Sequence, residues 1–481
     1  MRAESALPIP GKKGEKMLHK KRLSALVMAA LMLSSCASAK KAYTKVASDK
    51  TVINIWSSDE DLAGIVHCFL VNFPEFAEKY EIVPNVISRY MDEYETSLST
   101  ALSNGEETAP DIYIVPSDLA ARFCQGEDAD LAASYDQFFP DLDARLEDSQ
   151  IAPYTVEVGT RPSDGKVVGL SYEGGQGMMI YRRSIAKEVW GSDDPAVVSE
   201  HIGGGTGNWD KYLEAAEELR DAGYAALSGY EDLWNVFYSA SDKPWKINDE
   251  LYIDPQREAY LDLARTLRIS QFTNNHGTWT EEWYHSMEDR DDRRVFGYFG
   301  TLWFINDIVS YYACAYDGDE DQAPIAGTYG DWGVCTPPES FWWGGSWVMV
   351  GKQVVGSEKE EGVKKLLEYM TLDYTPAGLQ HVIANGYLYG YEGLKNSVPS
   401  SKVLLSADGS MPILGGQNPL PLIEQENAKC VGGNLHEKDG KIYNVWSEQV
   451  KQYVDGGKTR EETLSDFRSE VINKVDLEPE K

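Results

Sequence analysis

The sequence predicts an α/β fold, because strand, polar loop and helix follow one another in that order at two places. The first strand is expected at 52–56 (Val-Ile-Asn-Ile-Trp), and the polar loop 57–61 separates it from a helix whose apolar stripe begins at Leu62. The second strand is expected at 111–115, followed by the turn 116–118 and a helical run. Repeated strand–loop–helix order is typical of parallel βαβ units. In such sheets ligands bind beyond the carboxyl ends of the strands, where these polar loops lie.

Further helices follow from apolar residues that recur with helical spacing. One helix is expected over 209–220 with Asn208 as its N-cap, and an apolar stripe covers 363–370. Another helix is expected to begin with Thr375 as N-cap and to stop at 385–386, an Asn-Gly pair.

The composition is that of a folded protein with a large acidic excess. The chain has 481 residues, of which 42% are apolar and 25% charged, and its net charge is −32. A length of this size predicts several domains. Because a phosphate backbone requires a basic surface, the acidic excess argues against a nucleic-acid partner.

The N-terminus has the pattern of an export signal. A basic cluster precedes the apolar run 23–33, which is too short to span a bilayer, so residues 1–35 are expected to be a removed signal peptide. Met17, just before the basic cluster, is an alternative translation start. Leu-Ser-Ser-Cys, ending at Cys36, resembles a lipobox, which predicts a lipid on Cys36 and a tether over 36–50. The alternative is an ordinary signal peptide with an incidental cysteine.

The motifs of catalysis and metal binding are missing from the sequence. There is no HExxH, P-loop or GxSxG motif, and the histidines have no ligand spacing. The glycine run 203–207 lacks the strand that precedes a phosphate-binding loop, and the acidic turn 317–321 lacks the key positions of a calcium loop. We therefore expect no catalytic residue, no cofactor and no metal ion. The five further cysteines are expected to be mostly small buried side chains, and one disulfide between two of them is possible.

Aromatic side chains beside glycine-rich turns point to a ligand. The segment 341–347 (Phe-Trp-Trp-Gly-Gly-Ser-Trp) is the densest, and Trp56, Trp234 and Trp303 also adjoin polar or glycine-containing turns. Flat rings cover the C–H face of a sugar, while carboxylates, amides and indole N–H groups bind its hydroxyls. Each tryptophan is also a candidate core side chain, but the glycines beside Trp343 favour close approach to a ligand. The pattern favours a carbohydrate ligand.

Several segments, taken in order, resemble the extracellular solute-binding proteins of family 1, which bind carbohydrates for bacterial ABC importers. The segments that carry the resemblance are 52–62, 109–123, 165–188, 208–224, 295–307 and 329–350. The acidic insertion 314–328 and the stretch 415–445 have no counterpart in the family pattern.

The resemblance implies a two-lobe periplasmic-binding-protein-like fold with crossover hinge segments and a ligand cleft between the lobes. Lobe one is expected to comprise 51–172 plus 297–343, and lobe two 173–296 plus 344–475. Hinge closure would capture a sugar or oligosaccharide, and the protein would deliver it to the ABC transporter permease. The expected protein is a monomer, lipid-anchored at the cell surface or in the periplasm.

The predicted ligand-binding residues come from the polar loops of both lobes. They are Trp56, Asp59, Glu60, Ser117, Asp118, Glu173, Trp234, Trp303, Trp343, Gly344 and Ser346, with Gln417 and Asn418 as weaker candidates. Two alternatives stay open at this point. One is a secreted carbohydrate-active enzyme, and the other is a binding protein for a non-sugar solute such as a peptide or a polyamine.

Overall fold

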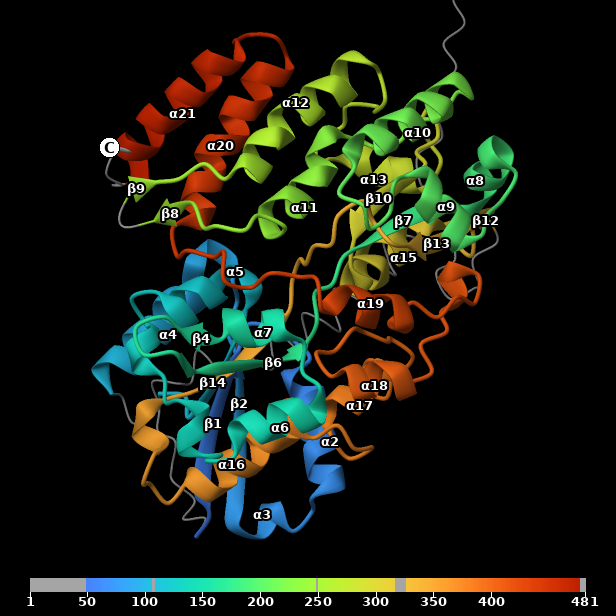
Figure 1. Cartoon of the computed structure of the whole chain (residues 1–481). Helices are drawn as coiled ribbons and strands as arrows, with labels where there is room; N and C mark the ends of the chain where they lie inside the picture. The colour runs from blue at the N-terminus through green and yellow to red at the C-terminus, as the bar shows by residue number, and fades with distance from the viewer. Residues whose placement is uncertain (1–48, 106–108, 248–249, 316–325, 476–481) are drawn as a thin grey trace, which may run out of the picture. The chain divides into compact units, whose positions relative to one another are not determined.

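The structure is a computed structural model of the chain (Figure 1). It describes residues 49–105, 109–247, 250–315 and 326–475. The predicted signal peptide, Cys36, nearly all of the tether and the acidic turn 317–321 lie outside the described residues. Among the helices that are described, none has the length and apolar character needed to cross a membrane.

A five-stranded sheet contains the predicted strand–loop–helix units. Its strands lie in the order β2 (Tyr80–Val86), β1 (Thr51–Ser57), β3 (Ile112–Pro116), β14 (Ser346–Val350) and β6 (Gly169–Glu173). Strand β1 is parallel to β2 and β3, and helix α2 (Leu62–Asn72) follows it in the chain. The predicted parallel arrangement of these strands is confirmed, while β14 runs antiparallel to β3 and β6.

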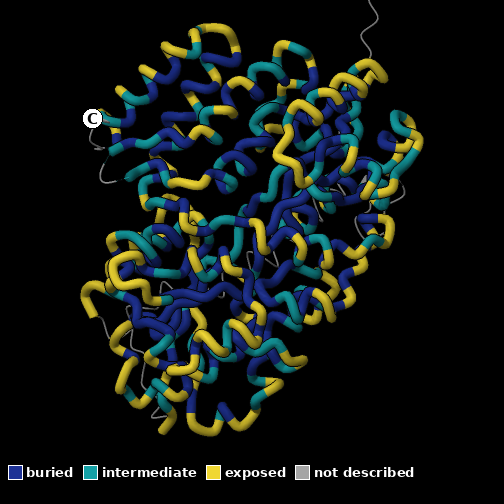
Figure 2. The backbone as a smooth tube through the Cα atoms, viewed as in Figure 1, coloured by how far each residue is buried: buried dark blue, intermediate teal, exposed yellow. Residues whose placement is uncertain are grey.

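Strands β3 and β14 in the middle of this sheet are buried along their whole length, whereas the edge strand β2 is largely exposed (Figure 2). In β3, Ile112 and Ile114 belong to one core cluster together with α2 and α16 (Glu360–Leu367). Tyr113 and Val115, which alternate with them, belong to another cluster with α4 (Glu93–Asn104) and α7 (Pro153–Val158). Because successive side chains of a strand point to opposite faces, a strand covered on both sides is apolar throughout, as β3 is.

A separate three-stranded antiparallel sheet has the order β10 (Gly297–Gly300), β7 (Met178–Arg182) and β13 (Trp332–Cys335). Its strands share a core cluster with seven helices. These are α8 (Arg183–Trp190), α9 (Pro195–His201), α10 (Trp209–Asp221), α11 (Trp234–Ser239), α12 (Pro255–Ile269), α20 (Asp439–Val454) and α21 (Arg460–Val475).

The strand pairing corrects the predicted division of the chain. Segment 297–343 was assigned with 51–172, but its strands β10 and β13 pair with β7 in the three-stranded sheet. Segment 344–475 was assigned with 173–296, but β14 pairs with β3 and β6 in the five-stranded sheet. The physical reason is that β3 and β6 do not pair with each other, and β14 returns from far along the chain to fill the place between them.

The separately predicted helices are found with one change of boundary. Helix α10 is capped by Asn208, whose side chain accepts hydrogen bonds from the backbone N–H groups of Asp210 (3.0 Å) and Lys211 (3.4 Å). The helix expected from Thr375 begins later, as α17 (Leu379–Ala384). The N–H of Thr375 donates to the side chain of Asp373, which folds residues 375–378 into a turn.

The remaining elements are short. They are α3 (Phe76–Lys79), α5 (Ser117–Ala120), α6 (Leu142–Ser149), α13 (Glu281–Met287), α14 (Leu302–Phe304), α15 (Ser310–Ala313), α18 (Ser401–Ser406), α19 (Leu420–Asn427), and the pairs β4 (Thr160–Arg161) with β5 (Lys166–Val167), β8 (Lys246–Ile247) with β9 (Glu250–Leu251), and β11 (Cys314–Ala315) with β12 (Ala326–Gly327). The described cysteines are all free thiols, so no disulfide joins them: Cys68, Cys124, Cys314, Cys335 and Cys430.

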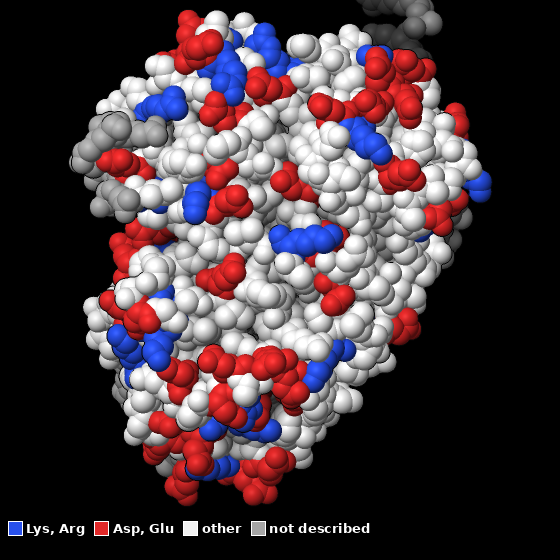
Figure 3. Space-filling view, viewed as in Figure 1, with Lys and Arg blue, Asp and Glu red and all other residues white. Residues whose placement is uncertain are grey.

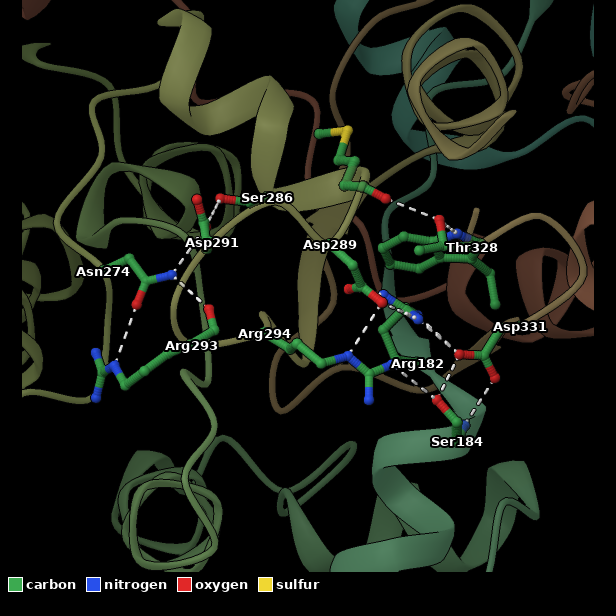
Figure 4. A network of polar contacts seen from close by, with 12 residues as sticks. Arg182, Ser184, Asn274, Ser286, Asp289, Asp291, Arg293, Arg294, Thr328 and Asp331 are labelled. Carbon is green, nitrogen blue, oxygen red and sulfur yellow. Dashed lines mark hydrogen bonds and ion pairs between the residues drawn. The ribbon is translucent and has the colours of Figure 1, made fainter. Parts of the chain in front are cut away.

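An ionic network closes the end of the central strand of the three-stranded sheet (Figure 4). Arg182, the last residue of β7, is buried and forms ion pairs with Asp289 (2.5 Å) and Asp331 (2.8 Å). The same carboxylates reach the surface groups Arg294 and Ser184. Because the guanidinium is satisfied on both sides, it joins the loop before β10 to the loop before β13.

Candidate ligand-binding site

Two adjoining cavities lie among the loops of the two sheets. The first has a volume of about 700 Å³ and the second about 330 Å³. Ser117, Asp118, Trp343 and Gly344 line both, so the cavities meet at these residues. We call the first the acidic pocket and the second the aromatic pocket, after the side chains that dominate each.

The directions of the strands determine the sheet edge at which the acidic pocket lies. The loop with Asp59 and Asp61 follows the carboxyl end of β1, and Ser117 follows that of β3, which is parallel to β1. Strand β14 is antiparallel to β3, so it begins at the same edge with Ser346, and Ser346 lies opposite Glu173 at the end of β6. Polar side chains from distant parts of the sequence therefore converge at one sheet edge.

Three partly buried carboxylates of this pocket accept few hydrogen bonds. Asp59 accepts from the hydroxyl of Ser346 (3.2 Å), Asp61 from the hydroxyl of Tyr172 (3.3 Å), and Glu173 from the amide of Asn396 (3.2 Å). The other carboxylate oxygen of Asp61, Oδ1, is buried without a hydrogen-bond partner in the described structure.

The surroundings of these carboxylates favour their protonated forms. Burial raises the pKa of Asp59, and burial together with the negative charge of Asp59 raises the pKa of Asp61 to about 7. Burial is also the main cause that raises the pKa of Glu173, and the charges of Asp61 and Asp59 add to it. The pocket therefore contains ionisable groups whose charged forms have few compensating partners.

Replacing Asp61 by asparagine is expected to stabilise the ligand-free protein at alkaline pH. The pKa of Asp61 is higher in the folded than in the unfolded state, so folding is disfavoured as pH rises from about 4 to about 7 and by a constant amount above that. Asp61→Asn removes this charge, and we expect a gain of about 1–2 kcal/mol at pH 8 and almost none at pH 4. Urea unfolding of both proteins at the two pH values measures the difference.

The matched control is Asp130→Asn, because the side chain of Asp130 is 82% exposed. It should leave the free energy of unfolding within about 0.5 kcal/mol of the parent at either pH. A loss of stability in Asp61→Asn at pH 8 would show that the charged carboxylate is stabilising in the fold.

The aromatic pocket contains the largest group of aromatic side chains at the site. They are Trp234, Tyr238, Trp279, Trp283, Phe299, Phe304, Trp342, Trp343 and Tyr443. Trp343 is half-buried at the boundary of the two pockets, and its ring lies 4.6 Å from that of Trp303 and 6.0 Å from that of Trp279. Trp279 itself is 48% exposed, so its ring is accessible to a ligand.

The glycine after Trp343 fixes the position of this ring. The indole N–H of Trp303 donates to the carbonyl of Trp343 (2.9 Å), and Gly344 follows with φ of +100°. A Cβ at Gly344 would lie 2.5 Å from Nε1 of Trp303. Only glycine combines this backbone conformation with this contact.

Nine of the predicted ligand-binding residues line the acidic pocket: Asp59, Glu60, Ser117, Asp118, Glu173, Trp303, Trp343, Gly344 and Ser346. Trp234 lines the aromatic pocket but is 6% exposed, because its ring stacks on Tyr443 at 5.0 Å. Trp56 lines neither pocket. It alternates with Ile55 and Ser57 along β1 and packs against the core cluster that contains Tyr94.

The weaker candidates Gln417 and Asn418 also lie outside both pockets. The side chain of Gln417 bonds to both backbone groups of Val334 and accepts from Arg183, so it holds a turn against β13. Asn418 accepts from the N–H of Leu420 at the start of α19. Both roles are structural.

Sequence reasoning missed several residues of the two pockets. They include Asp61, Arg89, Trp279, Asp307, Tyr391, Asn396 and Tyr443. Trp279 had a visible signal, since it lies between two threonines just after Gly277 and outside any apolar stripe. Tyr391 and Asn396 had none, because only the folded chain brings them to this pocket, where Asn396 donates to Glu173.

The sequence matches the family model of bacterial extracellular solute-binding proteins over residues 73–380. The chain belongs to this family. No curated protein matches it.

Solved structures show the same fold at low sequence identity. An extracellular solute-binding protein of family 1 has a TM-score of 0.68 and 16% identity, covering 89% of this chain and 99% of its own. The sugar-binding protein MalE from Xanthomonas citri has a TM-score of 0.64 and 14% identity, covering 89% and 98%. The galacto-N-biose-/lacto-N-biose I-binding protein of the ABC transporter from Bifidobacterium longum, in complex with lacto-N-biose, has a TM-score of 0.61 and 15% identity, covering 90% and 100%. The fold is therefore the two-lobe fold of periplasmic binding proteins.

Proposed function

We propose that this protein is a lipid-anchored sugar-binding protein that captures a saccharide and delivers it to the permease of an ABC transporter. The observation that carries the proposal is the pair of adjoining pockets, one lined by aromatic rings and the other by carboxylates, at the carboxyl ends of strands. Rings cover the apolar faces of a sugar and carboxylates accept from its hydroxyls. Two of the structures with the same fold are named as sugar-binding or saccharide-bound proteins.

The proposed mechanism is closure of two lobes on the ligand. One lobe is built on the five-stranded sheet and contributes Asp59, Ser117 and Glu173, and the other is built on the three-stranded sheet and contributes Trp303 just after β10. The crossovers are the segments 173–177 and 341–346, which pair with each other through Gln176 and Trp342. A ligand that contacts both lobes favours the closed state by its differential affinity for that state.

The anchor belongs to the same proposal. A lipid on Cys36 would hold the protein on the outer side of the membrane, and the tether would leave it free to meet the permease. We propose that it acts as a monomer and without an enzymatic step. Membership in a family of binding proteins supports this part of the proposal.

Replacing Trp343 by alanine is expected to weaken saccharide binding by about 1–3 kcal/mol, because the variant removes the ring shared by both pockets. The measurement is intrinsic-fluorescence titration of the wild-type protein with a panel of di- and oligosaccharides, followed by the same titration of the variant. Absence of binding across the panel would overturn the proposed function.

Trp190→Ala is the matched control. Its indole is also half-buried, stacks on His201 at 4.7 Å, and lines neither pocket. Both variants lose the same volume of side chain. Equal saccharide affinities of Trp343→Ala and Trp190→Ala would therefore show that Trp343 is not part of the binding site.

A further inference from the structure

The acidic pocket has more carboxyl groups than its basic side chains can pair. Six carboxylates line it: Asp59, Glu60, Asp61, Asp118, Glu173 and Asp307. Arg89 is the one Lys or Arg among its described lining residues, and Arg89 is already paired with Asp118. The pocket therefore has a net deficit of positive charge that a neutral sugar leaves in place.

The carboxylates of this pocket differ from those of the surface in how far water can solvate them. Figure 3 shows many Asp and Glu side chains on the visible face, where water solvates them. Asp59, Asp61 and Glu173 are instead partly buried, and Asp61 and Glu173 each accept one side-chain hydrogen bond from the described chain. Withdrawing charged carboxylates from water without partners is unfavourable, so these groups favour a ligand that brings both charge and donors.

A second observation is the unused oxygen of Asp61. Oδ1 is buried and accepts no hydrogen bond in the described structure, although Asp61 lines a cavity of about 700 Å³. An ammonium group has three N–H donors and no acceptor, so it matches a cluster of carboxylates better than a hydroxyl, which also needs a donor. Hydrogen bonds between charged partners are also the stronger ones.

We propose that the saccharide bound here is an amino sugar, and that its free ammonium group is held by Asp59, Asp61 and Glu173. This inference rests on the proposed function. Trp303 and Trp343 line the same pocket and offer ring faces to the C–H groups of the sugar and to its cation. The adjoining aromatic pocket would take the next ring of an oligosaccharide, whereas a linear polyamine has no ring face for it.

Calorimetric titration of the whole protein with matched oligosaccharides tests the inference. The probes are β-1,4-linked oligomers of two to four residues of glucosamine, of N-acetylglucosamine and of glucose, with spermidine as a non-sugar cation. The first two sugars differ by an acetyl group that removes the charge. We expect the free-amine oligomers to bind about 10–100-fold more tightly than either neutral series.

Asp61→Asn supplies the second arm of the test. It should reduce the affinity for the glucosamine oligomers about 10-fold and the affinity for the neutral oligomers by a clearly smaller factor, while Asp130→Asn should change neither. Thermal unfolding of both variants checks that they are folded.

The outcomes separate the inference from the function on which it rests. Equal affinities for the charged and neutral oligomers would overturn the amino-sugar inference and support sugar binding. Tighter binding of spermidine than of every saccharide would overturn both. Binding of none of the saccharides would overturn the proposed function and the inference with it.

Discussion

Replacing Arg182 by methionine is expected to lower the free energy of unfolding by about 3–5 kcal/mol. The side chain of Arg182 is 2% exposed and lies between Asp289 and Asp331, which are each 26% exposed. Its guanidinium also lies over the ring of Trp332, 5.2 Å from the centroid. Methionine fills much of the same volume but leaves two half-buried carboxylates without their shared cation, which is the costly way to break a buried ion pair.

The control for this prediction is Arg294→Met. Arg294 binds the same Asp289 at 3.0 Å, but its side chain is 36% exposed, and exposed ion pairs contribute less than about 1 kcal/mol. Urea unfolding should therefore separate the two arginines clearly. Replacing Asp289 and Asp331 by asparagine in the Arg182→Met background should recover part of the loss. Equal effects of both arginine variants would show that the network stabilises the fold through surface charge alone.

The strands and helices that the sequence predicted are those whose signals are local. Strands β1 and β3 are apolar runs followed by polar loops, and helix α10 carries both an apolar stripe and the N-cap Asn208. The start of α17 was misplaced because Thr375 and Pro376 form a good helix start by local rules, while the side chain of Asp373 binds the N–H of Thr375 and makes a turn there. A competing side-chain contact decided the boundary.

The sequence did not show in the same way which strands belong to which sheet. Strand β14 is separated from its partners β3 and β6 by more than 170 residues, and its apolar sequence fits either sheet. Its place depends on the gap between β3 and β6, which exists only once those strands have formed. The predicted boundaries near 173 and 344 lie between strands of different sheets, whereas the one near 297 does not, because β10 pairs with β7 in the three-stranded sheet.

The candidate site was predicted where a polar residue lies at or just beyond the carboxyl end of a strand. Asp59, Ser117 and Glu173 satisfy that rule, and all three line the acidic pocket. Trp56 was misleading because it is part of the strand, where alternation directs its ring to a buried face. Asn396 could not be predicted, since its contact with Glu173 joins residues 223 positions apart.

Replacing Gly344 by alanine is expected to lower the free energy of unfolding by about 2–4 kcal/mol and to weaken saccharide binding at least 10-fold. The φ of +100° is unfavourable for alanine, and strain of this kind amounts to about 1–3 kcal/mol. In addition the new methyl group would lie 2.5 Å from Nε1 of Trp303, which must move and give up its hydrogen bond to Trp343. That movement displaces the two rings that line the acidic pocket.

Gly345→Ala is the matched control, because it separates the effect of backbone strain from the effect of displacing Trp303. Gly345 has φ of +101°, but a Cβ there would meet its nearest neighbours, the carbonyl of Glu173 and the ring of Trp347, at 3.1 and 3.2 Å. Gly345→Ala therefore introduces the same backbone strain without displacing Trp303. We expect both variants to lose stability and only Gly344→Ala to lose most of its affinity, as measured by urea unfolding and calorimetric titration with the same saccharide. If Gly344→Ala binds as tightly as Gly345→Ala, the contact between Trp303 and Trp343 does not shape the site, and the ligand rests on the other rings of the aromatic pocket.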